Sequence, residues 1–194
     1  LSFVVPAHNE ELELPETLRS IQRAADAAKE KYELIVVDDG STDATALIAH
    51  QLGARIVPVN RRQIAAVRNA GARVARGEIL VFVDADTRIK VDHVIAALQA
   101  LANGYSGGSA RLAVDSHLPF WARLFLRSFC AVYFAAGLGV GAFLFMRRTS
   151  FDAVGGFGGR QGASLSRLHV FGLPAAARIA RHPGNPHPRC AGPA

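Results

Sequence analysis

Apolar and polar positions along the first hundred residues predict strands and helices in alternation. Short apolar runs that are rich in β-branched residues predict strands at 1–5, 34–37, 54–59 and 79–83. Apolar residues at intervals of three and four predict helices at 13–28, 43–53, 64–77 and 91–101. Four strand–helix repetitions with short connections are typical of a mostly parallel sheet that is covered by helices on both faces. A chain of 194 residues is long enough for one such domain.

Polar clusters follow three of the predicted strands, at 6–10, 38–41 and 84–87. Any one of them has a plain structural explanation, because Asp, Asn and Ser are common in turns and helix caps. In parallel α/β sheets, however, ligands bind beyond the carboxyl ends of the strands. The occurrence of polar clusters at three of these ends therefore predicts a binding site along that edge of the sheet.

The acidic residues of these clusters favour metal-assisted chemistry on a phosphorylated ligand. Asp84 and Asp86 come directly after a buried strand, in the spacing D-x-D. Two such carboxylates suit one hard divalent cation, Mn²⁺ or Mg²⁺, whose other ligands are phosphate oxygens and water. The cation would neutralise charge on a leaving diphosphate. Asp39, after a neighbouring strand, is placed to accept hydrogen bonds from a nucleobase or a ribose.

An apolar segment follows the last of these helices. Residues 128–146 carry no formal charge and by length alone could cross a bilayer. Because Gly137, Gly139 and Gly141 would interrupt a helix, we expect a helix at about 119–136, a glycine turn and a core strand through Phe143 and Phe145. Peripheral membrane contact through 119–146 and a membrane span are the alternatives.

The charge of the chain is unevenly distributed. The net charge is +6, yet every acid lies within residues 1–152, and the later residues carry five Arg and no acid. Because no element combines clustered Lys and Arg with aromatic residues, we expect no nucleic-acid partner. The two cysteines, Cys130 and Cys190, form no disulfide framework. No signal peptide precedes the first strand, which predicts a cytoplasmic location, either free or at the cytoplasmic membrane face.

Five motifs, taken in order, resemble those of family 2 glycosyltransferases. They are 6–10 (PAHNE), 37–43 (VDDGSTD), 68–71 (RNAG), 77–86 (GEILVFVDAD) and 151–157 (FDAVGGF). The resemblance implies a GT-A fold, which is an α/β, Rossmann-like, mostly parallel sheet flanked by helices. It also implies transfer of a sugar from a nucleotide-sugar donor to an acceptor that the sequence leaves unknown, with inversion and with Mn²⁺ or Mg²⁺ as cofactor.

The same resemblance divides the chain and assigns roles to its residues. It implies a nucleotide-binding half at about 1–90, an incomplete acceptor-side half at about 91–157, and a basic tail at 158–194 that is disordered or the product of a reading-frame slip. Gly155 and Gly156 would let the backbone approach a sugar, and His8 is expected only to pack. The metal ligands would be Asp86 and Asp84. The nucleotide would be bound by Pro6, Ala7, Asn9, Glu10, Asp39, Arg68, Asp84 and Ala85.

One departure from the family leaves the catalytic residue unassigned. In many members an acidic pair follows the Gly-Gly-Phe segment and supplies a general base, which a neutral sugar hydroxyl needs in order to attack. Here no acid follows Phe157. A nucleotide-sugar-binding remnant without activity is therefore an alternative. A haloacid-dehalogenase-like phosphatase is a more distant one, because its D-x-D-x-T motif would need the threonine one position later than Thr87.

Overall fold

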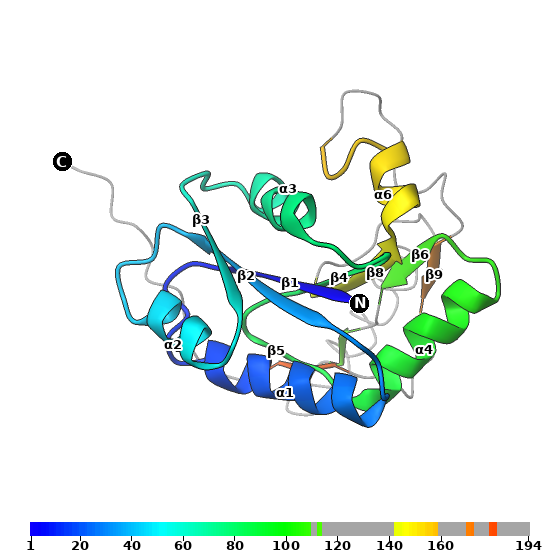
Figure 1. Cartoon of the computed structure of the whole chain (residues 1–194), viewed down its shortest axis with the longest axis horizontal. Helices are drawn as coiled ribbons and strands as arrows, with labels where there is room; N and C mark the ends of the chain where they lie inside the picture. The colour runs from blue at the N-terminus through cyan, green and yellow to red at the C-terminus, as the bar shows by residue number, and fades with distance from the viewer. Residues whose placement is uncertain (110–111, 114–141, 159–169, 173–178, 182–194) are drawn as a thin grey trace, which may run out of the picture.

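A central sheet covered by helices on both faces forms the body of the computed structural model in Figure 1. The structure describes residues 1–109, 112–113, 142–158, 170–172 and 179–181. The order of strands across the main sheet is β3-β2-β1-β4-β8-β6-β9. Their bounds are β1 Ser2–Ala7, β2 Glu33–Asp39, β3 Arg55–Val59, β4 Ile79–Val83, β6 Gly107–Ser109, β8 Phe143–Arg147 and β9 Val170–Gly172.

The main sheet is mostly parallel, as predicted. Strands β1 to β4 pair in parallel, as do β6 and β9, and β8 runs antiparallel between β4 and β6. A second, small sheet has the order β5-β10-β7. Its strands are β5 Thr87–Arg88, β7 Leu112–Ala113 and β10 Ile179–Arg181. The expected α/β class with a Rossmann-like, mostly parallel sheet is therefore confirmed.

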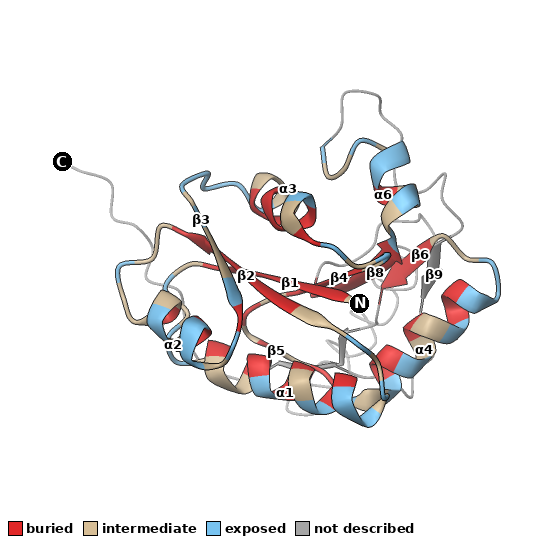
Figure 2. Cartoon of the chain, viewed as in Figure 1, coloured by how far each residue is buried: buried red, intermediate tan, exposed pale blue. Residues whose placement is uncertain are grey.

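The helices form a layer on each side of the sheet. Figure 1 shows α1 Leu14–Ala27, α2 Thr45–Gln51 and α4 Val91–Ala102 on one side, with α3 Ile64–Val74 and α6 Arg148–Ala153 on the other. Each layer has its own hydrophobic cluster against the sheet. Strands β1, β2 and β4 are buried almost throughout, while each helix is buried mainly on its inner face (Figure 2).

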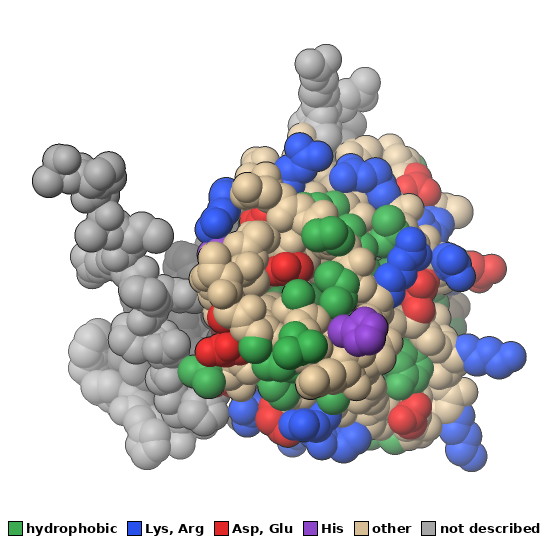
Figure 3. Space-filling model, turned by 60° about the vertical axis from the view of Figure 1, so that its left-hand side comes forward, with side chains coloured by type: hydrophobic (Ala, Val, Ile, Leu, Met, Phe, Trp, Pro, Cys, Tyr) green, Lys and Arg blue, Asp and Glu red, His purple; other side chains and the backbone are tan. Residues whose placement is uncertain are grey.

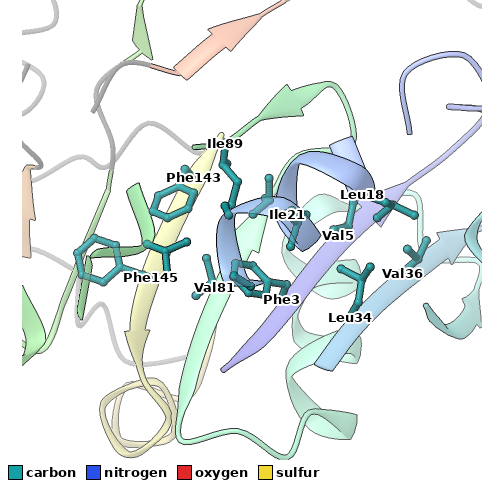
Figure 4. Packing of buried hydrophobic residues seen from close by; sticks show 14 of the residues in the cluster. Phe3, Val5, Leu18, Ile21, Leu34, Val36, Val81, Ile89, Phe143 and Phe145 are labelled. Atoms are coloured by element: carbon teal, nitrogen blue, oxygen red, sulfur yellow. The ribbon is translucent and has the colours of Figure 1, made fainter. Parts of the chain in front are cut away.

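Strand β1 shows how one short sequence supplies both clusters. Side chains alternate between the faces of a strand, so Phe3 and Val5 belong to the cluster that includes Leu18 and Ile21 of α1 (Figure 4), and Val4 belongs to the cluster on the α3 side. None of the three strand residues has any exposed surface. A continuous apolar run is the expected sequence of a parallel strand that is covered on both faces.

Gly71 allows α3 to approach the sheet closely. A Cβ atom at this position would lie 2.3 Å from Val4 Cγ1 and 2.8 Å from Val37 Cγ2. Any larger residue would force the helix away from β1 and β2. The close packing of α3 matters for the site, because the helix also carries Arg68.

Two strands extend further than the sequence pattern predicted. β1 continues through Pro6 to Ala7, although proline donates no hydrogen bond. β1 pairs with β4 only over residues 2–4, so Pro6 pairs with β2 and not with β4. β2 likewise extends past Val37 and includes Asp38 and Asp39. The polar residues expected just beyond the strand ends therefore lie partly within the strands, where the ladder fixes their positions.

The later part of the chain is described only in pieces. The predicted core strand through Phe143 and Phe145 is confirmed as β8, but the expected helix at 119–136 and the glycine turn lie outside the described residues. Among the helices that are described, none has the length and apolarity to cross a membrane. Within the segment expected to be a tail, 170–172 and 179–181 pair as β9 and β10. The domain boundary at 157 stays a prediction.

Candidate active site

Three polar segments meet at one edge of the main sheet. β2, β1 and β4 are neighbours and run in parallel, so the residues after their carboxyl ends lie side by side. Figure 3 views the molecule from nearer this edge, where acidic, basic and apolar side chains are intermixed. We call residues 7–11 and 39–45 the β1–β2 rim. We call Arg68, 84–86 and Phe157 the β4 rim.

Asn9 joins the loops that follow β1 and β2. Its backbone N–H donates to Ser41 Oγ at 3.0 Å, and its Oδ1 accepts the backbone N–H of Thr42 at 2.8 Å. Its φ is 54°, in the left-handed region that Asn tolerates better than most residues. Asn9 was predicted to bind a nucleotide, and the structure places its side-chain amide within the loop junction itself.

The next residues of the loop tie it to the start of α2. Glu10 donates its backbone N–H to Thr45 Oγ1 at 2.8 Å. Glu11 donates its backbone N–H to Asp43 Oδ2 and accepts that of Ala44 at its own Oε2, at 3.2 and 3.0 Å. Burial disfavours the charged form of Asp43, but hydrogen bonds from Thr45 and Glu11 outweigh this effect and lower the pKa of its carboxyl. The β1–β2 rim is thus held mainly by backbone N–H groups that donate to side-chain oxygens.

Asp39, the predicted base-binding residue, is buried and holds the loop after β3. Its Oδ1 accepts the backbone N–H of Arg61 at 2.6 Å, and its Oδ2 accepts that of Arg62 at 2.9 Å. Each carboxylate oxygen has a second lone pair, so these bonds leave acceptor capacity for a ligand. The Arg62 guanidinium Nη1 lies 2.8 Å from His8 Nε2, so His8, which was expected only to pack, also has a polar contact.

The D-x-D segment follows β4 directly and is fixed through its backbone. Asp84 donates its N–H to the carbonyl of Ala142 at 3.1 Å. The buried Ala85 accepts the Thr17 hydroxyl at its carbonyl oxygen at 2.6 Å. Asp86 Oδ1 accepts the Thr87 hydroxyl at 3.2 Å. These bonds leave both carboxylates half-buried at the sheet edge.

The two carboxylates supply oxygen ligands of the kind that a divalent cation takes. Among the described residues, no group of three or more His, Cys, Asp and Glu could hold a metal by itself. Mn²⁺ and Mg²⁺ commonly take one or two carboxylates and complete their coordination with phosphate oxygens and water. Asp84 and Asp86 could supply the two carboxylate ligands of such a cation.

Arg68 connects this segment to Phe157. From α3, its Nη2 donates to Asp84 Oδ1 at 2.6 Å, and its Cζ lies 5.6 Å from the centre of the Phe157 ring. Phe157 packs edge-on against Phe82 and Phe151, with ring centres 4.9 and 5.5 Å apart. The charged and aromatic groups of the β4 rim therefore form one contiguous unit.

Asn69 is a residue of this unit whose role the sequence reasoning missed. Its Nδ2 donates to the Phe157 carbonyl and its Oδ1 accepts the Phe157 N–H, both at 2.9 Å. Gly156 has a φ of +75°, and a Cβ there would lie 2.8 Å from Asn69 Oδ1. The sequence did carry a signal for this role, because Asn69 lies in the motif at 68–71 and Gly156 in the motif at 151–157. The predicted approach of Gly156 to a sugar stays a prediction.

The predicted residues fall into two groups. The structure brings Asn9 and Glu10 together with the loop after β2, and it brings Arg68 together with Asp84. Pro6 and Ala7 are buried within β1, and the Thr17 hydroxyl bond links Ala85 to α1. Asn9 and Glu10 follow β1 and Asp84 follows β4, and these two strands are neighbours in the sheet.

Comparison with known proteins identifies relatives among bacterial sugar transferases. An undecaprenyl-phosphate 4-deoxy-4-formamido-L-arabinose transferase of Aeromonas hydrophila is 35% identical over 113 residues, which are 54% of this chain and 34% of the relative. Its counterpart in Pseudomonas aeruginosa strain PAO1 is 34% identical over 113 residues, covering 54% of this chain and 33% of the relative. The chain spans about a third of the length of these curated relatives.

Solved structures share the fold. A mannosyltransferase from Pyrobaculum calidifontis, in complex with GDP-Man and Mn²⁺, has a TM-score of 0.72 at 24% identity, over 92% of this chain and 55% of that one. Glucosyl-3-phosphoglycerate synthase from Mycobacterium tuberculosis, with Mn²⁺ and UDP, has a TM-score of 0.66 at 22% identity, over 95% and 72%. The model of the family described as Glycosyl transferase family 2 matches residues 2–155. With the D-x-D carboxylates at the end of β4 and the polar loops of β1 and β2 beside them, this chain belongs to glycosyl transferase family 2.

Proposed function

We propose that this chain transfers a glycosyl group from a nucleotide-sugar donor to the phosphate group of a lipid, with inversion and with help from Mn²⁺ or Mg²⁺. The observation that carries the donor half of the proposal is the position of Asp84 and Asp86, which follow β4 directly beside the loops of β1 and β2. A nucleoside diphosphate lying along this edge would reach both rims.

The residues of the donor site would have distinct tasks. Asp39, at the end of β2, would accept hydrogen bonds from the base, and Asn9 and Glu10 would line the pocket for the nucleoside. Asp86, with Asp84 beside it, would hold the cation, which supplies charge neutralisation for the leaving diphosphate. Arg68 would lie close to the same phosphates, because its guanidinium contacts Asp84.

The acceptor half of the proposal starts from the residues around Phe157. The position several residues after Gly-Gly-Phe, where many family members carry an acidic base, has no acid in this chain. A sugar hydroxyl needs that base to lose its proton, whereas a phosphate oxygen is already ionised at neutral pH. A phosphate acceptor therefore accounts for the missing base. The names of the undecaprenyl-phosphate transferases support the same acceptor class.

Thermal unfolding with UDP, GDP, dTDP and CMP, first with Mn²⁺ and then with EDTA, tests the donor site. A ligand at about 100 times its Kd adds roughly 2.7 kcal/mol of stability. We expect one diphosphate to raise the unfolding temperature in a metal-dependent way. If no nucleotide has an effect, the donor site is wrong.

Transfer of a labelled sugar to polyprenyl phosphate, compared with the matching neutral polyprenol, tests the acceptor. We expect product only with the phosphate. Equal transfer to both lipids would contradict the phosphate acceptor and would require a base elsewhere.

The alternative of a nucleotide-sugar-binding protein without transferase activity rests on the same acid-free sequence after Phe157. It predicts a nucleotide-dependent shift in unfolding temperature, but neither transfer to polyprenyl phosphate nor hydrolysis of the donor. Combining the thermal and transfer assays therefore separates the two functions.

A further inference from the structure

A buried cation lies against the first carboxylate of the D-x-D pair. Arg68 is 8% exposed, and its Nη2 is 2.6 Å from Asp84 Oδ1. The Asp84 side chain is 24% exposed, so this ion pair lies at the boundary between the core and the site edge. A charge-assisted hydrogen bond of this length is among the stronger polar contacts in a protein.

Neighbouring groups hold the guanidinium in this position. Arg68 lies on α3, which Gly71 allows to pack closely against β1 and β2. Its guanidinium also lies over the ring of Phe157, which is held by the paired hydrogen bonds to Asn69 and by packing against Phe82. Arg68 is therefore positioned by a closely packed helix and by a hydrogen-bonded Phe157.

We propose that Arg68 makes the binding of the metal depend on the binding of the nucleotide. In the free protein the guanidinium neutralises Asp84 and opposes a bare divalent cation at the D-x-D pair. When a diphosphate arrives together with the metal, the same guanidinium attracts its oxygens. This inference rests on the donor site proposed above and adds a regulatory role for one of its residues.

The signs of the charges support this coupling. A bare Mn²⁺ ion carries two positive charges and is repelled by the nearby Arg68 guanidinium. A nucleoside diphosphate carries about three negative charges at neutral pH, because its terminal phosphate has a second pKa near 6. Its complex with Mn²⁺ is a net anion and is attracted. One guanidinium thus weakens the binding of free metal and strengthens the binding of the metal–diphosphate complex.

The experiment measures Mn²⁺ affinity by electron paramagnetic resonance, with and without UDP or GDP, for the whole chain and for variants. Arg68→Gln keeps a hydrogen-bond donor near Asp84 but removes the charge, and Arg68→Lys keeps the charge. Arg73→Gln makes the same charge change on an exposed position of α3 and is the matched control. Thermal unfolding without ligand establishes that each variant is folded.

For the wild type we expect weak binding of Mn²⁺ alone and binding that the diphosphate tightens. In Arg68→Gln, we expect Mn²⁺ alone to bind on the order of tenfold more tightly and the enhancement by the diphosphate to fall by at least the same factor, a size typical of coupling between sites. Arg68→Lys and Arg73→Gln should retain most of the coupling. Phe157→Leu, which keeps the backbone bonds to Asn69, should lower it by a smaller factor.

The outcomes separate this inference from the proposed function. If the wild type binds Mn²⁺ and diphosphate cooperatively and Arg68→Gln retains the full coupling, the role of Arg68 is wrong and the donor site stands. If Arg73→Gln loses as much coupling as Arg68→Gln, the effect comes from net charge, and the inference is again wrong. If the wild type binds neither ligand, the donor site fails and the inference fails with it.

Discussion

The two rims of the site are built with different chemistry. The β1–β2 rim is a network in which backbone N–H groups donate to the side-chain oxygens of Asn9, Thr45, Asp43 and Asp39. The β4 rim is built from the Arg68–Asp84 ion pair and the aromatic packing of Phe157. The first rim is a junction of two loops that hydrogen bonds join. The second is held by an ion pair and by packed aromatic rings.

This difference indicates a division of labour. Hydrogen bonds from backbone N–H groups fix the shape of a loop. An ion pair between a guanidinium and a carboxylate responds to each charge that enters the site. We therefore expect changes in the β1–β2 rim to affect stability first, and changes in the β4 rim to affect metal and nucleotide binding first.

The largest effect is expected for Asp86→Asn in the β4 rim. Loss of this carboxylate should remove the metal-dependent stabilisation by a diphosphate, about 2.7 kcal/mol at roughly 100 times the Kd. Thermal unfolding with nucleotide and Mn²⁺ measures it. Asp92→Asn, on the exposed first turn of α4, is the matched control and should keep the full shift. An unchanged shift in Asp86→Asn would show that the metal binds elsewhere.

Gly156→Ala should destabilise the fold by about 1–3 kcal/mol, because the new Cβ would meet Asn69 Oδ1 at 2.8 Å in addition to the strain of a positive φ. Gly158→Ala is a matched control with φ +76° and open space around the Cβ, so it has the strain without the contact. Urea unfolding of both variants isolates the contribution of the contact with Asn69. Equal losses in the two variants would mean that Asn69 adjusts without cost.

Asn9→Ala should destabilise the β1–β2 rim by about 1–2 kcal/mol, since it removes an exposed hydrogen bond to the Thr42 N–H and, above all, places Ala at a positive φ. Asn9→Gly loses the same acceptor without the backbone strain and should cost less. Urea unfolding of the two variants measures the difference. If Asn9→Gly is as damaging as Asn9→Ala, the hydrogen bonds, and not the φ angle, account for the role of Asn9.

The smallest effect is the pH dependence that Asp43 gives to this rim. Hydrogen bonds lower the pKa of its carboxyl in the folded protein below the ordinary 3.8. The unfolded chain therefore takes up protons first on acidification, and this contribution to stability is complete above about pH 5 and is lost as the pH falls through the folded pKa. The difference in free energy of unfolding between wild type and Asp43→Asn should shrink below about pH 4. A difference that stays constant down to pH 2 would contradict this role.

The sequence pattern predicted most of the first half of the fold. The strand Ile79–Val83 matches its predicted bounds, and the other predicted strands and helices up to residue 102 occur with ends that differ by a few residues. The helix expected to reach Gly77 ends at Val74. Here the Arg148 guanidinium donates to the backbone carbonyls of Ala72, Ala75 and Gly77. A side chain that comes from a distant part of the chain leaves no signal in the local pattern.

The order of the strands beyond β4 was not predictable in this way. β8 comes from residues 143–147, yet it lies between β4 and β6 in the sheet. β6 has the sequence Gly-Gly-Ser and carries no apolar alternation that would mark it as a strand. Its partners, and not its own residues, determine its conformation.

By itself, the sequence determined the elements that depend on local periodicity and the polar residues at the strand ends, including the D-x-D pair. Both are local properties, because side chains in a strand or a helix repeat at fixed intervals. Only the tertiary structure decided which groups contact one another. Asn69 and Phe157 are 88 positions apart, and Arg68 reaches Asp84 because Gly71 lets α3 pack against the sheet. Such contacts arise from the packing of distant segments, which no repeat in the sequence encodes.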